Sequence, residues 1–180
     1  MRSWYLQEYF DVVNEEDKPV CKRPRMECLT KGLLHRAICV LVNDNKGRII
    51  IQKRSHKKLW YPDYWTLSCT GHVSAGEEYA DAAKRELKEE LGLSVTSLEE
   101  LFKFLAPKYA YSNYVEWEFI KVFETWIAPG RAVRFNKEEI GEVRSVTREE
   151  LEKTANGGDE ISLTPDAVLA VRKYLELKGH

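Results

Sequence analysis

Residues 71–93 read GHVSAGEEYADAAKRELKEELGL, and the second half of this stretch is patterned as an amphipathic helix. Ala83, Leu87 and Leu91 recur at intervals of four residues, so they fall on one side of a helix and predict its buried face. Gly92 follows at the position where a helix commonly ends in a left-handed turn. The stretch therefore predicts a helix that packs on a core through one face and ends at residue 91.

Another stripe of the same helix carries three glutamates, Glu86, Glu89 and Glu90. Residues three and four apart are neighbours on a helix surface, so these carboxylates converge. Like charges at that spacing disfavour a helix by about 0.2–0.5 kcal/mol per pair, whereas a cation among them would reverse the repulsion. Mg²⁺ binds oxygen ligands, usually a few carboxylates together with substrate phosphates. The stripe indicates a divalent-cation site; the alternative is a solvated helix with incidental glutamates.

The glutamates belong to a longer motif with fixed spacing. It runs Gly71, five residues, Glu77, seven residues, Arg85-Glu86-Leu87, one residue, Glu89-Glu90, one residue, Gly92-Leu93. At roughly 7% usage per residue type, the seven fixed positions that are polar or glycine would coincide by chance about once in 10⁸ starts, so chance does not explain the motif. The motif resembles the signature of the Nudix hydrolase family at every fixed position.

The resemblance covers about residues 34–151 and implies an α/β fold, the Nudix α/β/α sandwich with a mixed central sheet. It also implies a Mg²⁺-dependent hydrolase, with Mn²⁺ as the alternative ion. Such an enzyme would cleave a diphosphate linkage in a nucleoside diphosphate derivative or a related organic diphosphate. In proteins of this family the ion is held at positions that match Glu86, Glu89, Glu90 and the backbone carbonyl of Gly71 here.

Two further charged positions complete the implied catalytic set. Arg85 would orient a neighbouring carboxylate, although an ordinary pair within the helix is the simpler alternative. A further acid often lies in this family on a loop before the last strand, and residues 136–142 occupy that place. We expect Glu139 to be the base for the attacking water or an extra metal ligand. Glu138 and Glu142 are the alternatives, and so is a solvated acidic loop.

The expected elements alternate between strands and helices within a single domain, residues 1–180. Apolar and β-branched runs predict strands at residues 9–14, 20–23, 37–42, 48–54, 65–70, 97–105 and 116–126. Thr164 and Pro165 suit the N-cap and first turn of a closing helix that reaches about residue 177. We divide the chain into an N-terminal hairpin extension (1–33), a core (34–151) and a C-terminal helix (152–180).

The composition limits the partners. With 180 residues, 43% apolar and 32% charged, and a net charge of −1, the chain has no global attraction to nucleic acid or anionic lipid. No apolar run approaches the length of a membrane span, and the start MRSWYLQEYFDVVNEED turns acidic, unlike a signal peptide. Four cysteines without metal-type pairing predict reduced thiols. We expect a cytoplasmic enzyme for a small-molecule diphosphate, and a homodimer through the N-terminal hairpin stays open.

The flanks of the motif resemble one branch of the superfamily, type I isopentenyl diphosphate isomerase and its hydrolase relatives. This second resemblance rests on Leu34-His35-Arg36-Ala37, Gln52-Lys53-Arg54-Ser55, Trp65-Thr66 and Gly71-His72. Glu116 and Glu118 in VEWEF resemble the two glutamates that the isomerase uses around its metal and its carbocation. His35 and His72 lie where the isomerase has metal-binding histidines. The alternatives are a packed histidine at position 35 and solvent-facing glutamates on one side of a strand.

One position separates this chain from the isomerase. The isomerase's essential cysteine immediately precedes the Gly-His pair, where this chain has Thr70, and Cys69 lies one residue early. In a strand, a shift of one residue points the side chain to the opposite face. A hydrolase is therefore favoured over an isomerase. A Nudix module that binds nucleotide or RNA without catalysis is the third alternative, but such modules normally lack motif glutamates that are all present here.

Substrate contacts are expected from two groups near the motif. Lys53 and Arg54 begin the basic segment KRSHKK (53–58), which could receive the distal phosphates; the alternative is a set of solvated lysines. Aromatic rings could stack on a nucleobase, and these are Trp60, Tyr61, Tyr64, Trp65, Tyr109, Tyr111, Tyr114 and Trp117. The alternative places Trp65 and Trp117 in the core. Our substrate-binding candidates are Lys53, Arg54, Trp65, Glu116 and Glu118.

Overall fold

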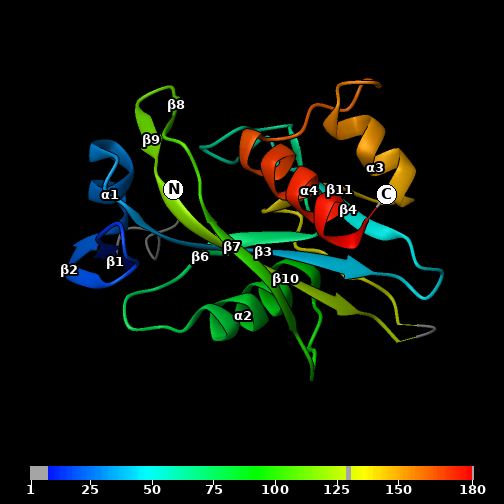
Figure 1. Ribbon diagram of the computed structural model, residues 1–180, viewed down its shortest axis with the longest axis horizontal. Coiled ribbons are helices and arrows are strands. Elements are labelled where there is room, and N and C mark those ends of the chain that lie inside the picture. The colour runs from blue at the N-terminus through cyan, green and yellow to red at the C-terminus, as the bar shows by residue number, and fades with distance from the viewer. Residues whose placement is uncertain (1–7, 129–130, 180) are drawn as a thin grey trace.

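The structure, a computed structural model, describes residues 8–128 and 131–179, and a mixed sheet lies at its centre (Figure 1). Helix α2 (Tyr79–Leu91) packs against one face of this sheet. Helices α3 (Arg148–Ala155) and α4 (Pro165–Lys178) cover the other face. The predicted α/β/α sandwich is confirmed. The start that predicts no signal peptide falls partly on residues 1–7, which lie outside the described residues.

The seven-stranded sheet follows the order β11-β4-β3-β10-β7, with β5 beside β4 and β6 beside β3. Its strands are β3 (His35–Asn43), β4 (Ile49–Arg54), β5 (Trp65–Thr66), β6 (Cys69–His72), β7 (Glu99–Leu105), β10 (Glu118–Trp126) and β11 (Ile140–Val146). Strands β3 and β10 run parallel, and the other pairs are antiparallel. The carboxylates at the start of β10 therefore lie beside the start of β3, because parallel neighbours begin at the same edge.

Strand β3 is buried on both faces, which explains its almost continuous apolar sequence. Ile38, Val40 and Val42 pack toward α2, whereas Cys39 and Leu41 pack toward α3 and α4. Alternation along a strand sends neighbouring side chains to opposite faces, so one strand serves both halves of the core. Because β3 is packed on both faces, the edge of the sheet where it begins, which carries the site residues, is held in a fixed position.

Helix α2 forms as its pattern predicts. Ala83, Leu87 and Leu91 are fully buried against the sheet, and each buried leucine contributes about 1.5–3 kcal/mol relative to an exposed one. Gly92 ends the helix at φ +65°, and its N–H donates to the carbonyls of Leu87 and Lys88. The left-handed conformation favours glycine at this position. The helix is therefore anchored at a fixed end, and Glu90 of its charged stripe is buried together with the apolar face.

The C-terminal face holds one helix that the strand-and-helix pattern did not predict. Helix α3 begins at a capping box in which Thr147 accepts from the N–H of Glu150 and the Glu150 carboxylate accepts from the N–H of Thr147. For α4 the prediction of a Thr164 N-cap is only half right. Thr164 occupies the N-cap position, but its hydroxyl makes no capping bond and lies 3.4 Å from the Thr66 hydroxyl instead.

Two predicted strands are divided in the structure. The predicted strand 65–70 breaks at residues 67 and 68, because β5 pairs with β4 whereas β6 crosses to pair with β3. The Ser68 hydroxyl stabilises this crossing by bonding the Val42 N–H and the Ile50 carbonyl. The predicted strand 116–126 likewise breaks at residue 117. Glu116 ends β9 (Tyr114–Glu116), which pairs in a hairpin with β8 (Tyr109–Tyr111), and β10 begins at Glu118. Gly71 consequently lies inside β6, at the sheet edge, instead of following a strand.

The N-terminal segment forms the predicted hairpin, β1 (Tyr9–Val13) with β2 (Pro19–Pro24), followed by helix α1 (Arg25–Lys31). The hairpin packs on its own chain: Phe10 is fully buried, and the Asp11 carboxylate accepts a 2.7 Å bond from the N–H of Gly76. All four cysteines are free thiols. Within the described part of the chain, the helices are too short or too polar to cross a membrane.

Candidate active site

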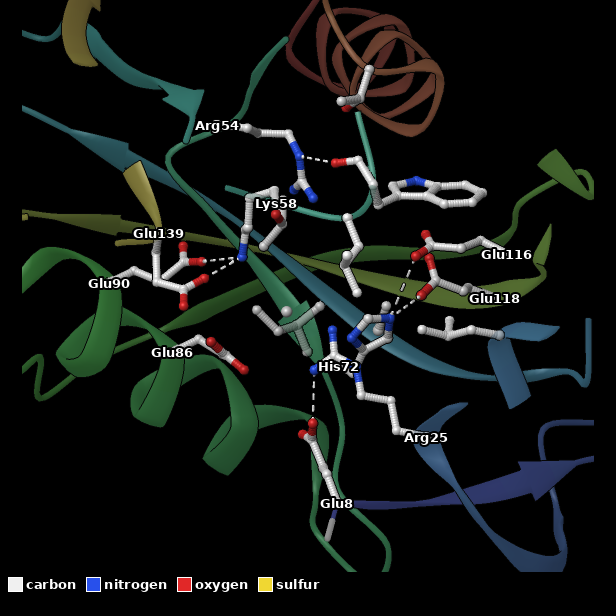
Figure 2. A pocket seen from close by; sticks show the side chains of 18 of the residues that line it. Glu8, Arg25, Arg54, Lys58, His72, Glu86, Glu90, Glu116, Glu118 and Glu139 are labelled. Carbon is white, nitrogen blue, oxygen red and sulfur yellow. Dashed lines mark hydrogen bonds and ion pairs between the residues drawn. The ribbon is translucent and has the colours of Figure 1, made fainter. Parts of the chain in front are cut away.

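A cleft of about 520 Å³ opens where β6, α2, the loop after β4, the hairpin β8–β9 and the start of α4 meet (Figure 2). Most of the predicted site residues line it, together with several that the sequence did not single out. The predicted ones are Arg54, Gly71, Arg85, Glu86, Glu89, Glu90, Glu116, Glu118 and Glu139. The helical stripe and the strand glutamates therefore face one common space.

The contact between Gly71 and Glu86 explains the glycine of the motif. A Cβ atom at position 71 would overlap the carboxyl group of Glu86, so any side chain there would push this glutamate out of place. Glu86 also accepts a 2.6 Å bond from Nη1 of Arg85. The backbone of β6 and the carboxylate of α2 thus meet directly at the floor of the cleft.

Arg85 ties the helix to the loop before it. Its Nε and Nη2 each bond the Glu77 carboxylate at 2.9 Å, and Nη2 also donates to the His72 carbonyl at 3.0 Å. Burial alone would raise the pKa of Glu77, but the bonds from Arg85 and from the Ser74 N–H outweigh it and keep this pKa below its usual range. Glu89 lies 3.5 Å from Arg85, so the expected orienting role and the ordinary helix pair are both present. Arg85 orients Glu86 and holds the loop 72–77 against α2.

A lysine occupies the space between two other carboxylates of the cleft. Glu90 accepts a 2.9 Å bond from Nε2 of Gln52, and its other oxygen lies 4.0 Å from Nζ of Lys58. Figure 2 shows the Lys58 ammonium facing both Glu90 and Glu139. Its close ion pair is with Glu139. Two acidic groups sharing one ammonium show that this position attracts positive charge.

The pKa values of the glutamates on the helical stripe also indicate a position that attracts positive charge. Burial and the neighbouring charge of Glu90, opposed by Arg85, together raise the pKa of Glu86 to about 7. Burial also raises the pKa of Glu90. Repulsion and desolvation both disfavour two ionised carboxylates here unless a cation compensates them. The donors present, carboxylate oxygens and the Gly71 carbonyl, are of the type that Mg²⁺ and Mn²⁺ bind. This wall therefore fits a divalent ion.

The opposite wall brings together a second ligand set. Among residues 8–128 and 131–179, only His35, His72 and Glu118 place three ligand atoms within 4.8 Å of one another. Nε2 of His72 lies 3.1 Å and Nε2 of His35 lies 3.2 Å from the same Glu118 oxygen. The stripe on α2 is looser, because Arg85 and Lys58 draw its carboxylates apart and Glu89 is 55% exposed.

The two histidines of this second wall make different contacts. Burial would lower the pKa of His72, but the bonds that it donates to Glu116 and Glu118 outweigh burial and raise this pKa to about 9. Both histidines hold the pKa of Glu118 well below its usual range. His35 is fully buried, and its Nδ1 donates to the Leu33 carbonyl at 2.7 Å. Its Nε2 lacks a bond with hydrogen-bond geometry in the described structure. The Nδ1 bond fixes the ring so that Nε2 faces the Glu118 carboxylate, an orientation that suits a metal ligand.

Several predicted site residues lie elsewhere. Trp65 is buried in the core, with the Arg144 guanidinium 4.6 Å from its ring centre, which confirms the alternative for this tryptophan. Lys53 does not line the cleft, because alternation along β4 turns it away from the face of Gln52. Glu142 pairs with Arg144 outside the cleft. Glu139 and Glu138 do line it, immediately before β11, and Glu138 pairs with Lys57.

The residue before the Gly-His pair behaves as the one-residue shift predicts. Thr70 lines the cleft, whereas Cys69 is fully buried in the core beside α2. Burial raises the pKa of the Cys69 thiol well above its ordinary value. A buried neutral thiol cannot donate or accept protons in the cleft at neutral pH. The proton-transfer position of the isomerase is thus occupied by a hydroxyl.

Some lining residues come from segments to which the sequence analysis assigned no site role. Glu8 and Arg25 reach the cleft from the N-terminal segment, joined by a 2.7 Å ion pair, and Thr164 and Asp166 reach it from α4. These positions carry no local motif; only the tertiary arrangement brings them to the cleft. The N-terminal extension and the closing helix are therefore parts of the site, not appendages to it.

Comparison with known proteins agrees with this geometry. The family model described as NUDIX domain matches residues 33–166. An uncharacterized Nudix hydrolase of Pseudomonas aeruginosa is 34% identical over 169 residues, with 91% of each chain covered. Isopentenyl-diphosphate Delta-isomerase 2 of Photorhabdus laumondii is 34% identical over 135 residues, which cover 75% of this chain and 71% of the relative.

A solved structure extends the match to the fold. A crystal structure from Deinococcus radiodurans superposes with a TM-score of 0.73 at 25% identity, covering 92% of this chain and 98% of that one. Hydrolase and isomerase relatives both occur, as the flanking sequences predict. The family model spans most of the chain, and the Pseudomonas relative matches nearly end to end, so this chain belongs to the Nudix hydrolase family.

Proposed function

We propose that this protein is a divalent-metal-dependent hydrolase, with Mg²⁺ or Mn²⁺, that cleaves the diphosphate linkage of a nucleoside diphosphate derivative or a related organic diphosphate. The observation that carries the proposal is that two carboxylates, the buried Glu90 and the largely buried Glu86, share the cleft wall on which Glu86 packs against Gly71. Raised pKa values at both show a surplus of negative charge. A buried surplus of this kind is costly unless a cation and an anionic substrate together resolve it.

The metal-binding role falls to the helical stripe. Glu86, Glu89, Glu90 and the Gly71 carbonyl would hold the ion, and Arg85 keeps Glu86 turned toward the cleft. When bound, a divalent ion would neutralise phosphate charge and promote loss of a proton from water. The intact set of motif glutamates supports catalysis over a binding-only role.

The remaining steps fall to residues on the loop side of the cleft. Glu139 accepts the proton of the attacking water, whose oxygen bonds to phosphorus while the bridging P–O bond breaks. Arg54 and Lys58 bind phosphate oxygens, because their cationic groups reach into the cleft (Figure 2). The Nε of Arg54 already donates to the Trp60 carbonyl at 2.8 Å, which fixes the guanidinium in place.

Isomerisation of an isopentenyl-type diphosphate is the second candidate. The observation that favours it is the group of His35, His72 and Glu118, with Glu116 3.8 Å from His72. Thr70 opposes it, because a hydroxyl with an ordinary high pKa is a poor proton donor or acceptor at neutral pH. Glu116 and Glu118 would then contact substrate in either reaction.

One experiment separates these functions. The purified protein is incubated with nucleoside diphosphate derivatives and prenyl diphosphates, with Mg²⁺ or with a chelator, and both released phosphate and allylic isomer are measured. The hydrolase proposal expects Mg²⁺-dependent cleavage of at least one diphosphate. An allylic product without phosphorus release would establish isomerisation instead. If neither product forms, only a binding role remains.

A further inference from the structure

The start of helix α4 places a carboxylate at the far side of the cleft from the α2 stripe. Asp166, in the first turn of α4, is half-buried and lines the same cleft as Arg54 and Trp60. No ion pair involves it within residues 8–128 and 131–179, and the hydroxyl of Thr164 is its close polar neighbour. A partly buried carboxylate without a cation faces the space that the substrate must fill.

The surroundings of Asp166 add to its negative character. Glu116 and Glu118 lie near enough to raise its pKa, after burial, to about 6, whereas Arg54 and Thr164 only partly offset this. A first-turn aspartate ordinarily gains from the helix dipole, so the opposite direction shows how strongly the cleft disfavours its charge. A phosphate cannot bind against this group without repulsion, so the diphosphate belongs near Arg54 and Lys58.

Trp60 and Tyr114 line the cleft together with Asp166, and the rings of Tyr61 and Tyr111 both contact Trp60. Tyr61 lies 4.5 Å from Tyr111 and 5.4 Å from Trp60, measured between ring centres, and Asp166 raises the pKa of Tyr61 after burial does. The loop that carries Tyr61 and the hairpin β8–β9 are therefore joined by ring contacts next to this carboxylate. A flat polar group fits such a wall better than a flexible hydrocarbon chain.

We propose that Asp166 accepts hydrogen bonds from hydroxyl or amino groups of the organic half of the substrate, and so selects a nucleoside diphosphate over a prenyl diphosphate. This inference rests on the proposed hydrolase function. An ionised carboxylate is an acceptor only, so it matches vicinal hydroxyls or an amine. A hydrocarbon placed over it would remove its water without supplying a donor, which opposes binding. The protein would then discriminate against a prenyl diphosphate because that substrate leaves the Asp166 carboxylate without a hydrogen-bond donor.

The test compares three substrates and three proteins. ADP, 2′,3′-dideoxy-ADP and isopentenyl diphosphate are offered with Mg²⁺ to the wild type, to Asp166→Asn and to Glu176→Gln. Glu176 is an exposed carboxylate on the same helix, so its variant is the matched control. Released phosphate gives kcat/KM for each pair, and thermal melting confirms that the variants are folded.

We expect Asp166→Asn to lower kcat/KM for ADP by about ten- to a hundredfold. For dideoxy-ADP the change should be less than about threefold if Asp166 binds the ribose hydroxyls, which are missing there, and equal to that for ADP if it binds the adenine amino group, which is retained. Isopentenyl diphosphate should lose nothing in the variant, and Glu176→Gln should match the wild type throughout. Equal losses on all three substrates, no loss on ADP, or a wild type that prefers isopentenyl diphosphate would each overturn this inference alone. A wild type that cleaves none of them would overturn the proposed function as well.

Discussion

The two walls of the cleft both carry buried carboxylates, but they balance the charge in opposite ways. On the α2 wall, burial raises the pKa values of Glu86 and Glu90, and a neighbouring carboxylate adds to each: Glu90 acts on Glu86, and Glu139 acts on Glu90. On the β10 wall, Glu118 is equally buried, yet two histidines hold its pKa well below its usual range. The α2 wall needs a cation from outside, whereas the β10 wall is compensated by His72 within the chain.

This difference teaches which wall depends on an added ion. A protonated His72 already supplies one positive charge to Glu118 at 3.1 Å. On the α2 wall, Lys58 supplies its charge to Glu139 more closely than to Glu90, which it approaches only to 4.0 Å. Removing the ion should therefore affect the α2 wall strongly and the β10 wall weakly, and four predictions test that contrast.

The largest effect is expected from removing one carboxylate charge on α2. Glu90→Gln, and likewise Glu89→Gln, should lower kcat by at least about a hundredfold, because each acts on the ion that carries most of the charge stabilisation. Asp81→Asn, an exposed acid on the same helix, should keep normal activity. Steady-state kinetics with Mg²⁺ measure kcat for each variant. A near-normal kcat in both glutamine variants would show that the α2 wall has no role in catalysis.

The next effect concerns the close approach of β6 and α2. Gly71→Ala places a methyl group into the Glu86 carboxylate, so either the helix or the side chain must move. We expect activity to fall at least tenfold and the free energy of unfolding to fall by about 1–3 kcal/mol, as for other overpacked sites. Gly141→Ala, in β11, where a methyl group would make only ordinary van der Waals contacts, is the control for adding a side chain to a strand glycine. Wild-type activity in the Gly71 variant would show that Glu86 does not need its present position.

The third prediction concerns the β10 wall and its dependence on pH. The pKa of His72 is raised from 6.5 to about 9 in the folded chain, so its contribution to stability is complete below pH 6.5 and is lost as the pH rises through 9. With a chelator present, we expect urea unfolding of the wild type to lose on the order of 2 kcal/mol across that range. The His72→Gln variant should lose much less. Parallel pH profiles would contradict the internal compensation of Glu118.

The sequence predicts the α2 wall well and the rest of the cleft only partly. Glu86, Gly92 and the buried leucines follow from spacing within one helix, which local geometry determines. The placement of Lys58 between two carboxylates, and that of Asp166 at the cleft, depends on segments that meet only in the folded chain. The break between β5, which pairs with β4, and β6, which pairs with β3, depends on bonds of the Ser68 hydroxyl. No local sequence pattern predicts those bonds. Contacts between distant segments are what the sequence could not supply.

The smallest effect, and the one that sharpens the contrast most directly, is the thermal shift caused by Mg²⁺. An ion at tenfold excess over its dissociation constant should stabilise the wild type by about 1.4 kcal/mol, or a few degrees in Tm. The shift should nearly vanish in Glu90→Gln, because that variant loses a ligand, but persist in His72→Gln, because the β10 wall is compensated without Mg²⁺. Calorimetry of the three proteins at equal Mg²⁺ measures this. A shift lost in His72→Gln and kept in Glu90→Gln would reverse the assignment and place the Mg²⁺ requirement on the histidine wall.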